Sequence, residues 1–527
     1  MNKTFYISTP IYYPSGNLTI GHCYTTFMCD AFARYKRACG DEVFFLTGTD
    51  EHGQKIQDKA KEKGVSPQQY VDDMATYIQN LWKSLDITYD DFIRTTQPRH
   101  EAVVQKVFSR FLKQGDIYLG KYHGWYCKPC ESFFTESQLV DGKCPDCGRE
   151  VTLEEEEAYF FKMSKYTDRL KDFYNNHVEM VTPSTRLKEV MVSFVEKGLE
   201  DLCVSRTSFD WGVKVKENPK HVVYVWLDAL LNYVTALGYG SDDETLFNKF
   251  WKDGTQKVHV LGKEITRFHL LYWPIFLMAL DIPLPDKFLV HGWILMKDGR
   301  MSKSKGNGVY PEPLKEMYGM DMLRYFLLRE ISFYEGGLFT PESFVERCNA
   351  DLANNYGNLT HRSLSMIRKY FDGVVPEYKG AIGEFDAPLE AAFKLATEQF
   401  FTKMDNFDIN NAIGAVFEAL DKANKYIDDA KPWALAKEEN KKEELASVMS
   451  HLANSIYIAS VLLSPFLLEG TTKILDMLKV DEKLRNYESI KLPFGVVGNN
   501  RIADTITPAY QRLDMQVEVE RIKSRMG

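Results

Sequence analysis

The sequence lacks the features that send a chain into a membrane or an export pathway. Residues 1–6 run directly into a predicted strand, without the basic and then apolar stretch of a signal peptide. The longest apolar run, residues 456–468, is too short to cross a bilayer and includes Pro465, so it predicts a core helix. We therefore expect a cytoplasmic protein.

The chain also lacks an excess of positive charge. Its net charge is −9 over 527 residues, so a nucleic-acid-binding surface would have to be a local patch. Cysteine is sparse, and an odd count of nine without an export signal predicts reduced thiols. The hydrophobic share of 44% and the charged share of 26% are typical of a globular protein. The length suits roughly three or four domains.

Strands and helices alternate in the first hundred residues. A strand at 4–9 precedes a helix at 21–38, in which apolar side chains recur at three- and four-residue steps, and a strand at 42–46 precedes a helix that ends near Gly64. This order predicts an α/β fold with a doubly wound, Rossmann-type parallel sheet that binds its ligand at the carboxyl edge of the strands. We expect the sheet to resume at 222–233 and to continue through 258–261, a helix at about 265–280, and one buried strand at 288–296.

Two loops carry residues that suit a polyphosphate. The loop at 10–22 leads into the N-terminus of the first helix, where free backbone N–H groups and His22 would face an anion. The loop at 300–307 holds two lysines and two serines directly after the apolar run. A basic loop of this kind, considered alone, is most often a solvated turn.

Together these loops resemble the paired signature of the class I aminoacyl-tRNA synthetases. The resemblance implies that the first loop holds ATP, that the second closes on its phosphates, and that magnesium accompanies the nucleotide. It assigns catalysis to Lys303, His22 and Thr19. Thr19 stands where the family usually has histidine, and Arg300 where it usually has lysine. The ATP-binding residues that it implies are Thr19, Gly21, His22, Arg300, Ser302, Lys303 and Ser304.

Two C-x-x-C pairs interrupt the alternating pattern. They are Cys127 with Cys130 and Cys144 with Cys147, and four thiols at this spacing suit one tetrahedral zinc ion. A redox disulfide and coincidence are the alternatives. Four cysteine ligands leave no open coordination position, so the zinc would be structural. We expect the region up to about residue 221 to be a domain inserted between the two halves of the sheet.

A polar cluster and an aromatic stretch indicate which family of the class I synthetases the chain resembles. Residues 49–52 fall at the expected edge of the sheet, where they would either cap the next helix or meet a ligand. Aromatic residues within 226–273 would either form core or wall a pocket, and such a pocket suits an unbranched thioether. With the cysteine knuckle and the Gly53–Lys55 tripeptide, this stretch resembles the methionyl-tRNA synthetase family. The isoleucine, leucine and valine enzymes usually carry a longer editing insertion than about a hundred residues can hold.

That resemblance implies the contacts of the amino acid. Asp50 would meet its amino group. The methionine-binding residues that the resemblance implies are Ile11, Tyr13, Asp50, Trp226, Ala229, Leu230, Tyr233, His269 and Trp273.

Beyond Phe339 the chain predicts long helices without strands, as in an all-α bundle. The resemblance implies that Asn358, Arg362 and Trp433 read the anticodon; a helix-surface pair and a buried tryptophan are the alternatives. Many members of the family carry a further tRNA-binding domain after a C-terminal helix like the one at 517–527, and we expect none in this chain. The expected segments are a first catalytic half (1–115), an inserted domain with the zinc knuckle (116–221), a second catalytic half (222–298), a phosphate-loop and stem-contact region (299–340), and the helical anticodon-binding bundle with its C-terminal helix (341–527).

The implied function is ATP-dependent ligation of methionine to its tRNA. The alternative is a synthetase-derived tRNA-binding module with weakened catalysis, which only Thr19 and Arg300 favour. The expected partners are methionine, ATP and methionine tRNA, with no membrane. The expected cofactors are one structural zinc per chain and magnesium with ATP. The chain would be a monomer, or a homodimer where a further C-terminal tRNA-binding domain exists.

Overall fold

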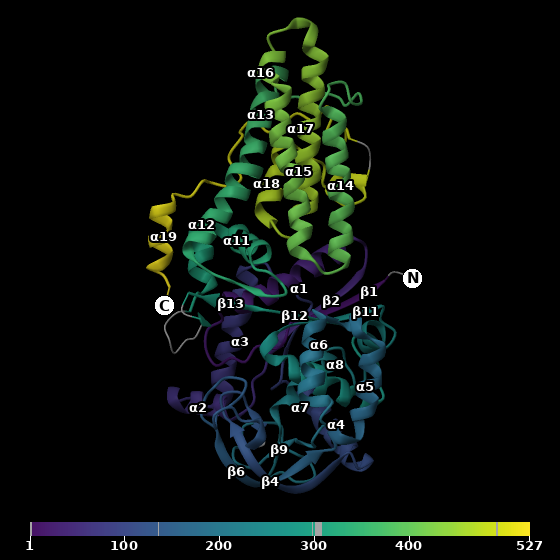
Figure 1. Cartoon of the computed structure of the whole chain (residues 1–527), viewed down its shortest axis with the longest axis vertical. Helices are drawn as coiled ribbons and strands as arrows, with labels where there is room; N and C mark the ends of the chain where they lie inside the picture. The colour runs from purple at the N-terminus through teal and green to yellow at the C-terminus, as the bar shows by residue number, and fades with distance from the viewer. Residues whose placement is uncertain (1–2, 135, 298, 301–307, 492–493, 527) are drawn as a thin grey trace. The chain divides into compact units, whose positions relative to one another are not determined.

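A computed structural model describes residues 3–134, 136–297, 299–300, 308–491 and 494–526 (Figure 1). The chain divides into two compact units, the first of residues 1–18 and 41–292 and the second of residues 19–40 and 293–527. Ser302, Lys303 and Ser304 of the predicted phosphate loop lie outside the described residues.

The first unit is built on a six-stranded parallel sheet in the order β3-β2-β1-β11-β12-β7. The central strands are largely buried, as expected where helices cover both faces of a parallel sheet, although the polar residues Lys257 and His259 interrupt the apolar pattern of β11. The α/β class with a doubly wound parallel sheet is therefore confirmed. The strands are β1 (Thr4–Ser8), β2 (Glu42–Thr49), β3 (Asp91–Arg94), β7 (Val181–Thr182), β11 (Gln256–Gly262) and β12 (Lys287–His291).

Helices follow the strands of this sheet. The second strand leads to α2 and α3, and the third leads to α4, which begins at a proline in its first turn and ends at the left-handed Gly115. The helices of the first unit are α2 (Gln54–Lys63), α3 (Pro67–Ser84), α4 (Pro98–Gln114), α5 (Thr167–Asn176), α6 (Ser184–Val190), α7 (Val225–Leu230), α8 (Asn232–Thr235), α9 (Thr245–Phe247) and α10 (Trp273–Leu280).

Two strand predictions were wrong. In the stretch 222–233, only β10 (Val222–Val223) is a strand, and it pairs antiparallel with β9 (Ser205–Arg206) outside the main sheet; α7 and α8 follow. The run 288–296 is two strands, because β12 ends at His291 and β13 (Trp293–Met296) pairs with strands of a different, three-stranded sheet. Short apolar runs do not distinguish one long strand from two short ones, or a strand from a buried helix.

The segment 116–221 forms a four-stranded sheet in the order β5-β4-β6-β8. Its two long strands, β4 (Ile117–Cys127) and β6 (Thr152–Phe161), pair antiparallel along most of their length, with β5 (Ser132–Phe134) and β8 (Leu202–Cys203) at the edges. β7, from the same segment, instead pairs with β12 and forms one edge of the main parallel sheet. This segment is thus joined to the main sheet by backbone hydrogen bonds.

The second unit joins α1 (Ile20–Ala38) to the C-terminal helices. α1 packs on α11 (Pro311–Glu330), and the guanidinium of Arg324 lies 2.6 Å from the Asp30 carboxylate, with both side chains fully buried. A small sheet places β13 between β14 (Gly299–Arg300) and β15 (Gly336–Leu338). The remaining helices are α12 (Pro341–Arg347), α13 (Asn358–Phe371), α14 (Asp386–Asp405), α15 (Ile409–Ala430), α16 (Pro432–Leu435), α17 (Lys442–Leu463), α18 (Leu468–Met477) and α19 (Met515–Lys523).

The long helices of the second unit form the predicted all-α bundle. Within it α14 packs on α15, and both pack on α17 (Figure 1). One stretch, Glu439–Leu463, is long and apolar enough to cross a membrane by length and composition, but 94% of its most apolar window is buried inside the fold. It is the core helix of the bundle, and Pro465 follows its end.

Candidate active site

The carboxyl end of β2 presents Asp50, Glu51 and His52 in succession. None of them caps the following helix, because the N-cap of α2 is Gly53 and has no side-chain cap. The helix-cap alternative for this cluster is therefore wrong. All three side chains are buried, so each needs a partner or a ligand.

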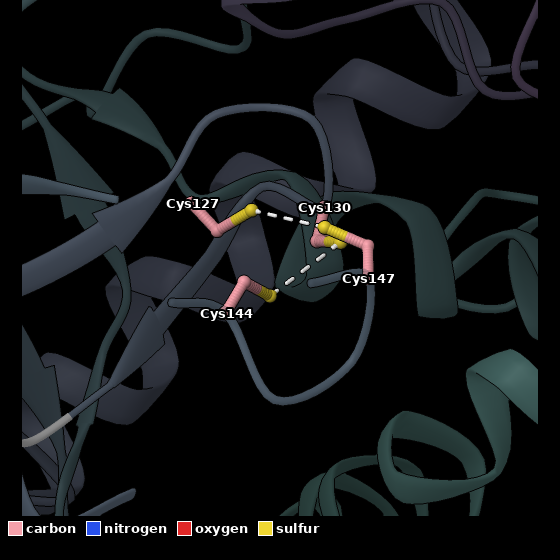
Figure 2. Close-up of side chains that lie close together, drawn as sticks. All are labelled: Cys127, Cys130, Cys144 and Cys147. Atoms are coloured by element: carbon pink, nitrogen blue, oxygen red, sulfur yellow. Dashed lines mark hydrogen bonds between the residues drawn. The ribbon is translucent and has the colours of Figure 1, made fainter. Parts of the chain in front are cut away.

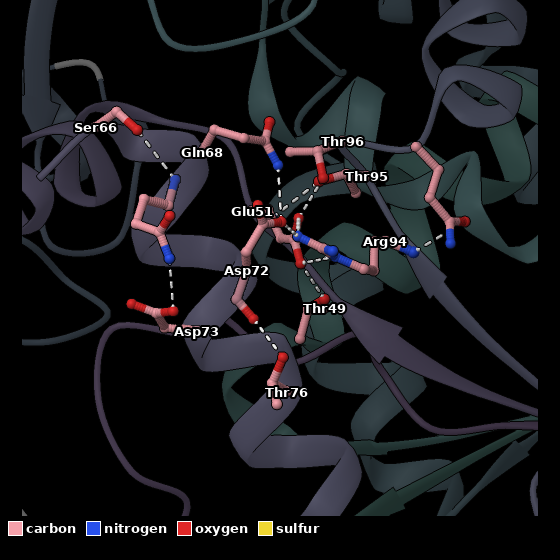
Figure 3. A network of polar contacts seen from close by, with 12 residues as sticks. Thr49, Glu51, Ser66, Gln68, Asp72, Asp73, Thr76, Arg94, Thr95 and Thr96 are labelled. Carbon is pink, nitrogen blue, oxygen red and sulfur yellow. Dashed lines mark hydrogen bonds and ion pairs between the residues drawn. The ribbon is translucent and has the colours of Figure 1, made fainter.

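Glu51 is held by a dense polar network (Figure 3). The Arg94 guanidinium donates to both carboxylate oxygens, at 2.7 and 3.0 Å. The Thr49 hydroxyl donates to Oε1 at 2.6 Å, and the Thr96 hydroxyl donates to Oε2. The backbone N–H of Glu51 donates to the Thr95 hydroxyl at 2.9 Å. These contacts fix the backbone on one side of Asp50.

His52 is held on the other side by Asp228 of α7. The Nδ1 atom of His52 lies 2.6 Å from Asp228 Oδ2, and Nε2 of His100 lies 2.7 Å from Asp228 Oδ1. Burial acts to lower the pKa of His52, but the Asp228 carboxylate raises it to about 10. Burial opposes ionisation of Asp228 as well, yet His52 and His100 hold its pKa at about 2. The pair is therefore a buried imidazolium and carboxylate.

Asp50 differs from its two neighbours. Its side chain is buried, and Oδ1 has no hydrogen-bond partner among the residues that the structure describes. Burial, and then the carboxylates of Asp228 and Glu131, raise the pKa of Asp50 well above its usual value, while His52 acts in the opposite direction. A buried carboxylate oxygen without a donor suits a cationic group of a ligand.

An aromatic cluster lies on α7, α8 and the helical stretch that leads into α10. The Tyr233 hydroxyl contacts His269 Nε2 at 2.7 Å, and His269 Nδ1 lies 3.0 Å from the carbonyl oxygen of Ile265. A carbonyl oxygen only accepts, so Nδ1 carries the imidazole proton and Tyr233 donates to Nε2. Burial lowers the pKa of His269 to about 4, which keeps the ring neutral. Trp226 stacks on Phe268 with ring centroids 3.7 Å apart.

The structure thus brings several of the predicted methionine-binding residues together. The ring centroid of His269 lies 6.4 Å from that of Trp226 and 5.7 Å from that of Tyr233. The ring centroids of Trp273 and Tyr233 are 5.6 Å apart. Trp273 is fully buried and donates its N–H to His259, while Ala229 and Leu230 are also buried. Ile11 is half-buried against the same core.

Tyr13 is held by a residue that sequence reasoning missed. Its hydroxyl donates to Glu131 Oε1 at 2.6 Å, and the Lys55 ammonium lies 5.2 Å from its ring centroid. The carbonyl oxygen of Glu131 accepts from the Tyr224 hydroxyl at 2.8 Å. A Cβ on Gly53 would lie 2.4 Å from the Glu131 carboxylate, so this close approach requires glycine. The only signal for Glu131 in the sequence is its place directly after the first C-x-x-C pair.

The four knuckle cysteines converge as predicted (Figure 2). Their sulfur atoms all lie within 4.8 Å of one another, with Cys127 and Cys147 at 3.6 Å and Cys144 and Cys130 at 3.9 Å. Four sulfurs bound tetrahedrally at about 2.3 Å from zinc lie about 3.8 Å apart. The cluster fits a zinc ion.

The predicted ATP-binding residues that are described lie in the second unit. Thr19 is the N-cap of α1, with Gly21 and His22 in its first turn. The Thr19 backbone N–H donates to His22 Nδ1 at 3.0 Å, so Nδ1 is the acceptor and Nε2 carries the proton of the neutral ring. Arg300 ends β14.

The predicted anticodon-reading residues lie on α13 and α16. Asn358 begins α13 and is exposed, and Arg362, one turn later, lies 3.4 Å from Asp428 of α15. Trp433 follows Pro432 at the start of α16, and 44% of its surface is exposed. The alternative of a buried core tryptophan is therefore wrong.

Family models, curated relatives and a solved structure all match this chain along nearly its whole length. A model described as "tRNA synthetases class I (M)" matches residues 5–152 and 147–364, and an anticodon-binding domain of methionyl-tRNA ligase matches residues 375–491. The methionine--tRNA ligases of Oceanobacillus iheyensis and Bacillus subtilis are each 52% identical over 100% of this chain and over 79% and 80% of their own lengths. A Mycobacterium tuberculosis methionyl-tRNA synthetase in complex with methionyl-adenylate is 40% identical, with a TM-score of 0.91 over 97% of this chain and 100% of that one.

Proposed function

The chain belongs to the methionine--tRNA ligase family of class I aminoacyl-tRNA synthetases, and from this premise we propose how its residues activate methionine and charge tRNA. In the first step the methionine carboxylate attacks the α-phosphorus of ATP, giving methionyl-adenylate and pyrophosphate. In the second step the 3′-hydroxyl of methionine tRNA attacks the carbonyl carbon of the adenylate, so that an ester bond forms, the acyl–phosphate bond breaks and AMP leaves. The comparisons give no support to the alternative of a weakened tRNA-binding module.

Asp50 binds the ammonium group of methionine. The observation that carries this assignment is its buried Oδ1, which has no donor among the described residues, whereas Glu51 and His52 beside it are each paired. An ammonium ion supplies both the hydrogen bond and the charge that this oxygen lacks. The raised pKa of Asp50, caused first by burial, indicates a carboxyl group whose ionisation is favoured by an incoming cation.

The methionine side chain lies against the aromatic cluster. Trp226, Tyr233 and His269 offer ring faces and edges, and sulfur makes favourable contacts with both. The neutral His269 keeps charge away from the thioether. Tyr13 and Ile11 form the wall of the methionine pocket next to the first strand. The cluster is supported from the core by Ala229, Leu230 and Trp273.

The family resemblance assigns the phosphates of ATP to the start of α1 and to the loop 300–307. The N-terminus of α1 offers backbone N–H groups and the positive end of the helix dipole, with Thr19, Gly21 and the Nε2–H of His22 as further donors. Arg300 and Lys303 neutralise charge that develops on the departing pyrophosphate, and the hydroxyl groups of Ser302 and Ser304 donate hydrogen bonds to it. Magnesium accompanies the nucleotide.

One zinc ion binds to Cys127, Cys130, Cys144 and Cys147. The sulfur separations support this proposal, and four thiolates leave no position for substrate. The ion therefore supplies folding energy to the knuckle and takes no part in the reaction.

The helical bundle reads methionine tRNA through Asn358, Arg362 and Trp433. The exposed ring of Trp433 suits stacking on an unpaired base, which contributes about 1–3 kcal/mol per base. Trp433→Ala should lower tRNA charging about tenfold or more while leaving methionine-dependent pyrophosphate exchange within about twofold, because activation needs no tRNA. Equal losses in both rates would instead place Trp433 in a structural role.

The proposed division of labour follows five segments. Residues 1–115 and 222–298 bind methionine, 116–221 carry the zinc knuckle, 299–340 contact the phosphates and the tRNA stem, and 341–527 read the anticodon. The protein acts in the cytoplasm, and as a monomer unless a further C-terminal domain joins two chains.

The function of Asp50 is tested by Asp50→Asn in the methionine-dependent exchange of pyrophosphate into ATP. The amide is isosteric but uncharged, so we expect kcat/KM for methionine to fall about a hundredfold or more. Asp210→Asn is the matched control, since the Asp210 side chain is 92% exposed. Exchange by Asp50→Asn at the rate of this control would show that another group binds the ammonium.

A further inference from the structure

Arg267 is a largely buried cation in the helical stretch that leads into α10. Only 12% of its side chain is exposed. Its Nε and Nη2 atoms are buried and have no hydrogen-bond partner among the residues that the structure describes. Burying a guanidinium is costly, so its position depends strongly on the nearest carboxylate and on the rings that pack against it. The reaction steps proposed above give Arg267 no role.

Arg267 contacts the cysteine knuckle in two ways. Its Nη2 atom lies 3.5 Å from Oδ2 of Asp146, which is part of the second C-x-x-C pair. Asp146 is the one carboxylate that pairs with Arg267 within the described part of the chain. The guanidinium carbon also lies 5.1 Å from the ring centroid of Phe134, a residue of β5 that packs in one apolar cluster with the knuckle cysteines. The fold of the knuckle therefore fixes both contacts.

Arg267 also contacts the aromatic cluster of the methionine pocket. The guanidinium carbon lies 4.9 Å from the ring centroid of Phe268. Phe268 stacks on Trp226, with ring centroids 3.7 Å apart and an angle of 10° between the ring planes. A further ring, that of Phe194, lies 5.5 Å from the guanidinium carbon. Because a planar guanidinium packs favourably on aromatic rings, Arg267 gathers three rings from separate parts of the chain around one charge.

We propose that Arg267 is a positioning residue for methionine, which anchors the aromatic cluster to the cysteine knuckle. Its guanidinium, held by Asp146, fixes the ring of Phe268. Phe268 in turn fixes the ring of Trp226, against which the methionine side chain lies in the proposed pocket. The inference rests on that pocket and deepens it. Arg267 itself touches neither methionine nor ATP.

The anchor gives the knuckle an effect on methionine binding. Asp146 lies between two of the proposed zinc ligands, Cys144 and Cys147, so an ion bound to them also fixes Asp146. The knuckle then acts on the pocket through Arg267 without taking part in the reaction. The effect is on the placement of the methionine side chain, so we expect it in the KM for methionine and not in kcat.

The test is a double-mutant cycle at Arg267 and Asp146 in the full-length chain. Methionine affinity is measured by calorimetry, and zinc content is measured on each preparation. Arg267→Met removes the charge, and Asp146→Asn removes that of its partner, whose side chain is 37% exposed. Asp141→Asn is the matched control for Asp146, because Asp141 is an exposed residue of the same knuckle. Arg99→Met is the control for Arg267, since the Arg99 side chain is 43% exposed and pairs with Asp91.

We expect Arg267→Met to weaken methionine binding about tenfold and Asp146→Asn about fivefold, with zinc content unchanged. The double variant should bind methionine as weakly as Arg267→Met does, within about twofold, because both changes interrupt one connection. Both controls should bind methionine like the wild-type protein. Multiplied effects in the double variant, or wild-type affinity in Arg267→Met, would overturn the proposal. Loss of zinc from Arg267→Met would overturn it in favour of a role in folding the knuckle.

Pyrophosphate exchange separates positioning from chemistry. Arg267→Met should raise the KM for methionine by the factor seen in calorimetry, and kcat should stay within about threefold. Arg267→Lys, which keeps the charge but not the planar group, should recover only part of the affinity. A fall in kcat at an unchanged KM would overturn the proposal.

Fluorine NMR decides the question even if Arg267→Met fails to fold. In a chain labelled with fluorotryptophan, the resonance of Trp226 is assigned by its loss in Trp226→Phe. Asp146→Asn should shift this resonance, and Asp141→Asn should leave it in place. An unchanged Trp226 resonance in Asp146→Asn would overturn the proposal. Unchanged methionine binding by Trp226→Ala would instead refute the proposed pocket, which is a different result from failure at Arg267.

Discussion

Removing a single hydroxyl group from Tyr233 should raise the KM for methionine without slowing the chemical step. The Tyr233 side chain is buried, and its hydroxyl donates to His269 Nε2 at 2.7 Å. Tyr233→Phe leaves this Nε2 atom as a buried acceptor without its donor, since Nδ1 already donates to the Ile265 carbonyl oxygen. The ring of His269 is then oriented by one contact instead of two.

The magnitude follows from the cost of an unsatisfied buried acceptor, which is about 1–3 kcal/mol. Part of this cost lowers the free energy of unfolding. The rest makes the free energy of methionine binding less favourable, because methionine needs His269 in one orientation. We expect the KM for methionine to rise about 5- to 30-fold, which corresponds to about 1–2 kcal/mol. We expect kcat to stay within about threefold, because neither side chain touches the reacting carboxylate or phosphate in the proposed site.

The assay is methionine-dependent pyrophosphate exchange at saturating ATP, with thermal unfolding measured on the same preparations. Tyr239→Phe is the matched control, because among the described residues the Tyr239 hydroxyl has a single, long hydrogen bond, at 3.5 Å from Arg110. An unchanged KM in Tyr233→Phe, or the same rise in Tyr239→Phe, would refute the role of the Tyr233–His269 hydrogen bond. A fall in kcat with an unchanged KM would place Tyr233 in the chemical step instead.

Three further predictions concern metal, pH and the anchor of α1. The native chain should hold one zinc ion, and Cys144→Ser should lose it and loosen the knuckle, as metal analysis and limited proteolysis would report; a native chain without zinc contradicts this. The pKa of His269 is lowered to about 4 from an unfolded value of about 6.5. Its neutral form therefore contributes stability that is fully present above about pH 6.5 and is lost as the pH falls through 4. Between these pH values, the free energy of unfolding of His269→Gln should fall less than that of the wild-type protein. Asp30→Asn should destabilise the second unit by about 3–5 kcal/mol by leaving the Arg324 guanidinium buried without its carboxylate, and adding Arg324→Met should recover much of the loss.

Local patterns predicted much of the fold. The apolar steps of α1, the strand-loop-helix order around β2, and the two C-x-x-C pairs each depend on residues close in sequence, and the structure confirms the elements that they predict. The run 222–233 was misassigned because its helices are apolar on nearly every side, which hides the helical period. The end of one strand and the start of the next at Gly292 were not predicted. They depend on the strands that pair with β12 and β13 in two different sheets, and the apolar run itself does not indicate them.

The site was predicted less completely than the fold. Resemblance singled out Asp50, but its neighbours Glu51 and His52 are paired with Arg94 and Asp228, which lie 43 and 176 residues away in sequence. Glu131 reaches Tyr13 across 118 residues. The hydrophobic periodicity of the sequence does not indicate such pairs, because they form only when the sheet brings distant loops together.

The most direct test of the account is the amino-acid dependence of pyrophosphate exchange by the wild-type chain. With each amino acid supplied alone, methionine should support the highest kcat/KM. An apolar pocket separates similar side chains by only about 1–3 kcal/mol, so leucine and isoleucine should follow roughly 5- to 150-fold below it. A higher kcat/KM for leucine or isoleucine than for methionine would contradict the account.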